Sequence, residues 1–221
     1  MKTVNIAIDG PSGAGKSSIS KKVAADLGFI HVDTGAMYRA IGLYAIRNGC
    51  LEPDQIAAVI EEVDVTLRFI GGSQRVMLCG EDVTDCIRTP EVSMAASKVS
   101  AVPAVRAHLL DLQKKIAAEN DIIMDGRDIG SVVLPHADLK IFLTASAEER
   151  ASRRYLELRE KPDCPPYEDI LRDIRQRDEN DMHRAIAPLI QAPDAVLVDS
   201  TSMGFNEVVD TITAMIRETI D

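Results

Sequence analysis

A short apolar run near the start of the chain leads directly into a glycine-rich turn. The run is VNIAI at 4–8, and the turn is GPSGAGKS at 10–17, which matches the pattern G-x-x-x-x-G-K-[S/T]. The segment 16–27 that follows has its apolar residues on one helical face, namely Ile19, Val23, Ala24 and Leu27. A strand, a glycine turn and a helix in this order predict a unit of a parallel sheet covered by helices.

The turn has the composition of a phosphate-binding loop. Its glycines can adopt conformations that direct successive backbone N–H groups inward, and the start of the following helix adds a partial positive charge. In such loops the lysine, here Lys16, reaches the β- and γ-phosphates of a nucleoside triphosphate, and the hydroxyl group, here Ser17, ligates Mg²⁺. We therefore predict a triphosphate site built from Gly10, Pro11, Ser12, Gly13, Ala14, Gly15, Lys16, Ser17 and Ser18.

Further short apolar runs alternate with amphipathic segments along the chain. A helix is predicted at 36–49, ending at Gly49, and a last helix at about 204–219. Strands beyond the first are predicted at 29–33, 121–125, 139–145 and 195–200. Strands that alternate with helices favour an α/β fold, with a five-stranded parallel sheet and helices on both faces.

Two segments depart from this alternation. The segment 63–84 reads as two strands joined by a Gly-Gly-Ser turn, which predicts a hairpin, and we treat about 63–100 as a small antiparallel insert. The segment 147–184 is helical and rich in charge, and the prolines of KPDCPP at 161–166 interrupt it. It is a candidate mobile lid, although an ordinary pair of solvated helices would have the same composition.

Composition narrows the classes of protein that the chain can belong to. Its 221 residues, 46% of them hydrophobic, are enough for one full core. A net charge of −10 argues against nucleic acid and anionic membranes as partners, and no apolar run approaches the roughly 18 residues of a membrane span. The four cysteines are scattered, so we expect reduced thiols without a zinc site, and a cytoplasmic protein.

Charged and polar residues follow the ends of two predicted strands. VDTGAMYRA at 32–40 brings Thr34, Tyr38 and Arg39, and IIMDGRDIGSVV at 122–133 brings Asp125, Arg127 and Asp128. In open parallel sheets ligands gather beyond the carboxyl ends of the strands, so both groups are expected to face the glycine-rich loop. An arginine can bind a phosphate bidentately, and Asp125 has the position of a carboxylate that orients hydrated Mg²⁺.

More arginines gather in the second half of the chain. Arg177, Asp181 and Arg184 are four and three residues apart, which puts them on one helical face, where a salt-bridged surface would be equally consistent. A second group follows a predicted strand and consists of Arg150, Arg153 and Arg154. An acidic chain that gathers guanidinium groups in these segments is expected to close on several phosphates.

The loop by itself leaves several activities open. A guanine-specific switch needs an Asn/Thr-Lys-x-Asp motif after a strand, and EKPD at 160–163 lacks both the first residue and that position. A kinase for another small acceptor, such as another nucleotide or a shikimate-like alcohol, stays open, as does a nucleotide-gated switch with slow hydrolysis. The many arginines favour an acceptor that carries a phosphate.

Five blocks together resemble the bacterial-type cytidylate kinases, a family of P-loop nucleoside monophosphate kinases. They are IAIDGPSGAGKSS, VDTGAMYRA, GEDVTDCIRTPEVSMAASKVSAVPAVR, MDGRDIGSVVLPHADLKIFLTASAEERASRR and RDENDMHRAIAPLIQAPDAVLVDSTSM, which span nearly the whole chain. Ser131 and His136 depart from common family residues without touching the expected chemistry. The resemblance implies transfer of a phosphoryl group from ATP, with Mg²⁺, to CMP or dCMP. We also expect the enzyme to be a monomer.

The resemblance also implies roles for individual residues. Lys16, Arg127, Arg153 and Arg154 would be catalytic, and Asp125 would hold the metal through water together with Ser17. The acceptor site would consist of Thr34, Tyr38, Arg39, Ser97, Arg106, Arg127, Asp128, Arg177, Asp181 and Arg184. One kinase domain of 1–221 is expected, with a core of about 1–62, 101–147 and 185–221, a nucleotide-binding insert at 63–100 and a lid at 148–184.

Overall fold

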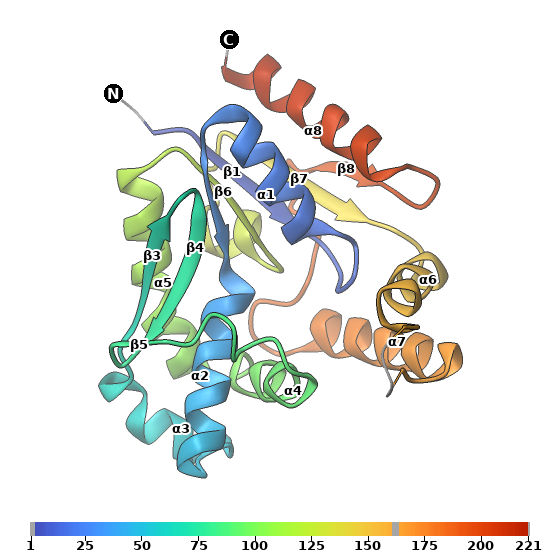
Figure 1. Cartoon of the computed structure of the whole chain (residues 1–221). Coiled ribbons are helices and arrows are strands. Elements are labelled where there is room, and N and C mark those ends of the chain that lie inside the picture. Colours follow the sequence, from blue (N-terminus) through green and yellow to red (C-terminus); the bar gives the residue numbers. More distant parts are fainter. Residues whose placement is uncertain (1–2, 161–163, 221) are drawn as a thin grey trace.

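A five-stranded parallel sheet forms the centre of the fold (Figure 1). The computed structural model describes residues 3–160 and 164–220, and the strands follow the order β2-β6-β1-β7-β8. Their bounds are β1 (Asn5–Asp9), β2 (Ile30–Asp33), β6 (Ile122–Gly126), β7 (Leu139–Thr144) and β8 (Val196–Asp199). These strands confirm the five predicted from the sequence, and their ends shift by one residue at most.

Helices cover both faces of this sheet because successive residues of a strand point to opposite sides. Ile6 and Ile8 of β1 pack with α1 (Lys16–Leu27) and α8 (Phe205–Ile220). Ala7, between them, belongs to the other core, with residues of α2 (Thr34–Asn48) and α5 (Pro103–Glu119). Both faces are therefore buried, which explains the continuous apolar character of the strands and confirms the predicted layers.

The carboxyl ends of the neighbouring strands β2, β6 and β1 align at one edge of the sheet. Asp9 pairs in register with Gly126, and Asp33 pairs with Asp125. Helix α2 begins at Thr34, two residues earlier than predicted, because Asp33 caps it by accepting a hydrogen bond from the Ala36 N–H at 3.0 Å. The carboxylates after the three strands thus meet where the glycine-rich loop begins.

The insert contains the predicted hairpin and a helix that was not predicted. It begins after α3 (Pro53–Val59) and η1 (Ile60–Glu62) and forms a second, antiparallel sheet of β3 (Val65–Ile70), β4 (Ser73–Leu78) and β5 (Glu81–Asp82). The strands end at Asp82, and the rest of the proposed insert is not antiparallel but contains the helix α4 (Pro90–Val99). Thr89 caps α4 through the Val92 N–H, and proline at the first helical position suits a helix start.

Two packed helices occupy the segment predicted as a lid, at the lower right of Figure 1. They are α6 (Ala147–Leu158), capped by Ser146, and α7 (Tyr167–His183). They share a small apolar cluster of Ala151, Ile170, Leu171 and Ile174. Part of the predicted interruption KPDCPP, and of the EKPD segment, lies outside the described residues.

One further element follows β6 directly. The backbone after Asp128 forms a single π-helical turn, η2 (Ile129–Val133), a rare conformation that occurs often at functional sites. Across residues 3–160 and 164–220, every helix is too short or too polar to cross a membrane.

Candidate active site

The glycine-rich loop joins β1 to α1 with a tightly constrained backbone. Gly13 and Gly15 have φ angles of 77° and 86°, which only glycine adopts readily. At Gly10 an added Cβ atom would lie 1.9 Å from the carbonyl oxygen of Leu143 on β7, so no other residue fits there. The loop therefore presents backbone N–H groups at the start of α1, which is the arrangement that binds phosphates.

Lys16 lies at the first position of α1 and is buried. Its ammonium group donates a hydrogen bond to the carbonyl oxygen of Pro11 at 2.7 Å, within the loop itself. Burial and the nearby guanidinium group of Arg127 lower the pKa of Lys16 well below its ordinary value. A negatively charged ligand beside Lys16 would offset both effects, so the surroundings of Lys16 favour the binding of an anion.

Ser17, Asp125 and His31 form a connected polar group beneath the loop. The Ser17 hydroxyl donates to Oδ2 of Asp125 at 2.7 Å, and Nε2 of His31 lies 2.6 Å from Oδ1. Burial raises the pKa of Asp125, but the contact with His31 and the charge of Lys16 outweigh this effect, and its pKa is lowered. Asp125 is therefore an ionised carboxylate held from two sides.

This donor set fits the ligands that Mg²⁺ prefers. A serine hydroxyl and a carboxylate oxygen lie side by side next to the phosphate loop, and Mg²⁺ is commonly held by one or two such groups together with substrate phosphates and waters. Within the described part of the chain, no cluster of three or more His, Cys, Asp or Glu side chains could form an all-protein metal cage. The residues suit a metal that arrives with a nucleotide.

Arg39 and Asp33 form an ion pair at the end of β2. Nη2 of Arg39 donates to Oδ2 of Asp33 at 2.8 Å, and the same oxygen lies 3.7 Å from Nη2 of Arg88. Nε of Arg39 is buried, and among the described residues it has no hydrogen-bond acceptor. A buried donor without an acceptor is costly, so this guanidinium group is ready to bind an anionic ligand.

The turn after β6 directs Arg127 and Asp128 into two separate networks. Nε of Arg127 donates to Oδ2 of Asp181 on α7 at 2.8 Å. Asp128 is buried and accepts hydrogen bonds from Arg106 at Oδ2 and from Arg184 at Oδ1, the latter at 3.2 Å. The family resemblance implied that these five residues share one site, and in the structure all five line the same cleft.

An aromatic ring and a serine border the carboxylate of Asp128. The guanidinium carbon of Arg106 lies 5.6 Å from the centre of the Tyr38 ring, within the range of a cation–π contact. Burial raises the pKa of the Tyr38 phenol, so it stays a neutral hydrogen-bonding group. Ser97 on α4 lines the same space, which makes this end of the cleft a small pocket with mixed polar groups.

Most of these groups line one continuous cleft of about 390 Å³, whereas His31 does not. Most of the predicted site residues border it, while Gly10, Pro11 and Ala14 lie behind the loop surface and are buried. Among the described residues, eight basic and five acidic side chains line it, against a net charge of −10 for the chain. They are Lys16, Arg39, Arg88, Arg106, Arg127, Arg154, Arg177, Arg184, Asp33, Asp125, Asp128, Asp181 and Glu157.

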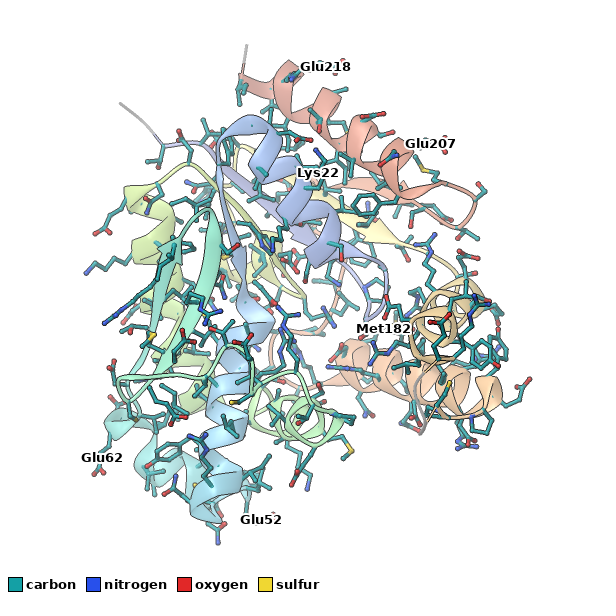
Figure 2. The ribbon with its side chains drawn as sticks, viewed as in Figure 1. Lys22, Glu52, Glu62, Met182, Glu207 and Glu218 are labelled. Atoms are coloured by element: carbon teal, nitrogen blue, oxygen red, sulfur yellow. The ribbon has the colours of Figure 1, made fainter. Side chains whose placement is uncertain are left out.

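Some exposed acidic side chains lie away from this cleft. Figure 2 shows Glu207 and Glu218 on α8, and Glu52 and Glu62 on either side of α3, at the outer rim of the molecule. All four are exposed. Since like-charged guanidinium groups are crowded in the cleft, and burial together with Arg127 lowers the pKa of Arg177, the interior of the cleft attracts anions.

The three arginines of α6 have different surroundings. Arg150 is buried and binds Asp178 through two hydrogen bonds and the carbonyl oxygen of Ser12 at 2.8 Å. Arg154 borders the cleft and pairs with Glu157 at 2.9 Å. Arg153 points elsewhere and donates to the carbonyl oxygen of Ser200 after β8 at 2.6 Å.

The sequence thus grouped these three side chains more closely than the fold does. Successive residues of a helix point about 100° apart, so Arg153 and Arg154 cannot share one direction. The structure brings Arg154 to the cleft but not Arg153, and the catalytic role of Arg153 stays a prediction.

Several residues in or next to the site were not predicted. Asp9, at the end of β1, is buried and binds the backbone after Asp128. His31 lies within a predicted strand and contacts Asp125, and Arg88 comes from the loop before α4. The position of Asp9 at a strand end was a usable signal, whereas the contact of His31 depends on strand order.

The arrangement can bind two anionic groups facing each other. One set of donors is the loop with Lys16, and the other is the wall formed by Arg39, Arg127 and Arg177. Asp125 and Ser17 lie on the loop side of the cleft. A phosphorylated molecule on each side would bring donor and acceptor together, which is the geometry required for transfer of a phosphoryl group.

Comparison with known proteins gives a consistent family. The model of the cytidylate kinase family matches residues 6–218. A cytidylate kinase of Caldicellulosiruptor bescii is 52% identical over 214 residues, which are 96% of this chain and 95% of that protein. A cytidylate kinase of Caldicellulosiruptor saccharolyticus is 52% identical over 222 residues, covering 100% of this chain and 98% of the relative.

A solved structure shares the fold at low sequence identity. The crystal structure of an uncharacterized protein from Eubacterium ventriosum ATCC 27560 superposes with a TM-score of 0.52 and 16% identity, covering 100% of this chain and 99% of that one. The family match and the two relatives extend over the loop, the insert and the helices of the cleft. The chain therefore belongs to the cytidylate kinase family.

Proposed function

We propose that the protein transfers the γ-phosphoryl group of ATP to CMP and to dCMP, giving ADP and CDP or dCDP. The observation that carries this proposal is the single cleft in which a phosphate loop faces a wall of arginines. Membership of the cytidylate kinase family supports cytidine monophosphates as the acceptors. Because residues of one chain build the whole cleft, we further propose that the enzyme works as a monomer. We also propose that it works in the cytoplasm.

The donor nucleotide binds to the loop Gly10–Ser18. Its phosphates accept hydrogen bonds from the loop N–H groups, and the ammonium group of Lys16 leaves the carbonyl oxygen of Pro11 to bind them. Ser17 and Asp125 would hold Mg²⁺, Ser17 directly and Asp125 through water, and their adjacent oxygens fit this role. When bound, the metal would supply positive charge that neutralises the phosphate oxygens.

The acceptor nucleotide binds on the opposite wall. Arg39 has a buried free N–H, and Arg39 and Arg127 bind the monophosphate. Arg177 and Asp181 on α7 bind the sugar hydroxyls. Arg127 engages one carboxylate oxygen of Asp181, and among residues 3–160 and 164–220 no hydrogen bond to the other oxygen is found. These contacts place the acceptor phosphate oxygen in line with the γ-phosphorus atom.

The base occupies the pocket at the far end of this wall. Asp128 and Ser97 offer oxygens to the 4-amino group of cytosine, and Arg106, Arg184, Thr34 and Tyr38 complete the pocket. A carboxylate has about four lone-pair sites, so Asp128 can accept a further hydrogen bond beside its two arginines. Uracil presents a carbonyl oxygen at that place, which costs roughly 1–3 kcal/mol for each unsatisfied group.

Catalysis then rests on position and charge. Phosphoryl transfer passes through a loose transition state whose charge is spread over the γ-oxygens, and no covalent enzyme intermediate is needed. Lys16, Arg127 and Arg154 neutralise that charge from the loop, the β6 turn and α6. Closure of α6 and α7 over the cleft excludes water, which would otherwise accept the phosphoryl group.

One coupled assay tests the proposal. ADP production from ATP is measured with CMP, dCMP, UMP and AMP as separate acceptors, and with no acceptor. We expect rapid turnover with CMP and dCMP and much slower turnover with UMP and AMP. Preference for another acceptor would identify a different kinase, and slow hydrolysis that ignores every acceptor would identify a nucleotide-gated switch. Equal turnover of CMP and UMP would refute the base pocket.

A further inference from the structure

Asp9 connects the two halves of the cleft through the backbone. It is the last residue of β1 and directly precedes Gly10 of the phosphate loop. Its side chain is buried, and both carboxylate oxygens accept hydrogen bonds, Oδ1 from the Ile129 N–H and Oδ2 from the Gly130 N–H, each at 2.7 Å. A contact that spans 120 residues of sequence therefore fixes the turn after β6 to the start of the loop.

The backbone that Asp9 holds carries two residues of the acceptor site. Arg127 and Asp128 come immediately before the two anchored N–H groups, at the start of the π-helical turn. The turn is closely packed, because a Cβ atom added at Gly126 would lie 2.8 Å from Oγ1 of Thr34 and 2.6 Å from Cδ1 of Ile129. A shift of the anchored groups would therefore move the Asp128 carboxylate.

The retained charge of Asp9 is not explained by stability. Burial raises its pKa to about 6, although the two N–H groups and Lys16 partly offset this effect. Ionising a buried carboxyl is costly, so the charge of Asp9 does not by itself add to stability. A carboxylate nevertheless offers something that an amide lacks, namely two acceptor oxygens in a fixed geometry for two neighbouring N–H donors.

We propose that Asp9 is a positioning residue that sets the place of Arg127 and Asp128 relative to the phosphate loop. It acts on acceptor binding and on the choice of CMP over UMP, and this role rests on the proposed function. Asp9 itself is not among the described residues that line the cleft, so it touches neither nucleotide. Its effect passes through the backbone of residues 126–130.

The test compares Asp9→Asn with a matched control. In Asp9→Asn one oxygen becomes an NH₂ group that faces an N–H donor, and the two donors repel each other. Asp121→Asn is the control, because Asp121 also accepts a backbone hydrogen bond of the β1 region, from the Val4 N–H at 2.7 Å, at the opposite end of the strand. Both variants are assayed for KM and kcat with CMP and UMP, for ATP affinity by calorimetry and for thermal unfolding.

We expect Asp9→Asn to raise the KM for CMP and to lower the CMP-to-UMP ratio of kcat/KM, each about tenfold, which matches one poorly made polar contact. ATP affinity should change less than about threefold, and Asp121→Asn should leave all constants unchanged. An unchanged CMP-to-UMP ratio in Asp9→Asn would overturn the proposal. So would equal losses for CMP, UMP and ATP, since they would mean a general structural role.

A second variant covers the case in which Asp9→Asn does not fold. Asp9→Ser removes the buried charge and the opposing donor, which favours folding, and its shorter side chain leaves at least one N–H group without its partner. It should lose base discrimination in the same way, and full discrimination would again overturn the proposal. The wild-type assay separates the two hypotheses, because a wild type that makes no ADP in response to CMP refutes the proposed function itself.

Discussion

Replacement of Arg127 by alanine tests the central residue of the cleft. Arg127 follows β6 and lines the cleft, and its Nε binds Asp181 of α7 at 2.8 Å. In the proposed reaction its guanidinium group binds the acceptor phosphate and faces the charge that develops on the transferred group. Loss of one such donor typically costs about 2.7–4 kcal/mol in the transition state, so kcat should fall by about a hundredfold to a thousandfold.

The same change removes a partner from a nearly buried carboxylate. Asp181 is 8% exposed, and an unsatisfied buried group costs roughly 1–3 kcal/mol of unfolding free energy. The charge of Arg177 also acts on Asp181, so we expect a loss near the lower limit. The variant should therefore remain folded, with a lower but cooperative melting transition, and its loss of activity will not be due to unfolding.

Steady-state ADP production at saturating ATP, with CMP varied, gives kcat and KM for the variant. Arg172→Ala is the matched control, because Arg172 forms an exposed ion pair on α7 with Asp169 at 2.7 Å. Such pairs contribute about 0–1 kcal/mol, so this variant should keep wild-type constants. A kcat of Arg127→Ala within about threefold of wild type would refute the role of Arg127 in stabilising the charge on the transferred phosphoryl group.

Three further predictions follow from other contacts of the site. Lys16→Ala should lower kcat by about a hundredfold or more, as the loss of a transition-state donor does. Single-turnover kinetics with CMP measure the rate of the chemical step, and a wild-type rate for that step would contradict the prediction. His31→Phe removes the 2.6 Å contact with Asp125, so the Mg²⁺ concentration that gives half-maximal activity should rise severalfold. The Mg²⁺ concentration at which ATP stabilises the protein against thermal unfolding should rise in the same way. Unchanged Mg²⁺ concentrations in both assays would mean that Ser17 alone orients the carboxylate. Asp9 has a pKa raised from 3.8 to about 6, so between these pH values the folded state binds more protons than the unfolded state. The free energy of unfolding of wild type, relative to Asp9→Asn, should therefore fall by on the order of 3 kcal/mol as the pH rises from about 4 to 7. Denaturant titrations of both proteins across this range measure that decrease, and the same pH dependence in both would contradict it.

Much of the fold could be predicted because its signals are local. The five strands are apolar runs bounded by turns, and consecutive glycines just before Ser73 mark the turn of the hairpin. Helix α4 was missed, although Thr89 and Pro90 form a recognisable start, because the segment was read as a continuation of the hairpin. The family of the chain and its parallel sheet were both predicted and are confirmed.

The candidate site was predictable where residues follow a motif or a strand end. The positions of Arg39 and Asp128 after β2 and β6 predicted that they lie at the site, and both line the cleft, whereas their individual roles were implied by the family resemblance. The direction of a side chain was less predictable, as Arg153 shows, because it depends on where α6 meets the loop after β8. His31 escaped notice because its partner on β6 is 94 residues away.

The sequence by itself determined the phosphate loop, since its glycines, Lys16 and Ser17 are adjacent and its conformation depends on local backbone freedom. It also determined which arginines were available to face that loop. Only the tertiary structure decided how these groups are held, because the order of β2, β6 and β1 brings His31 to Asp125 and Asp9 to the turn after β6. Such contacts join residues about a hundred positions apart, and no local periodicity or spacing records them.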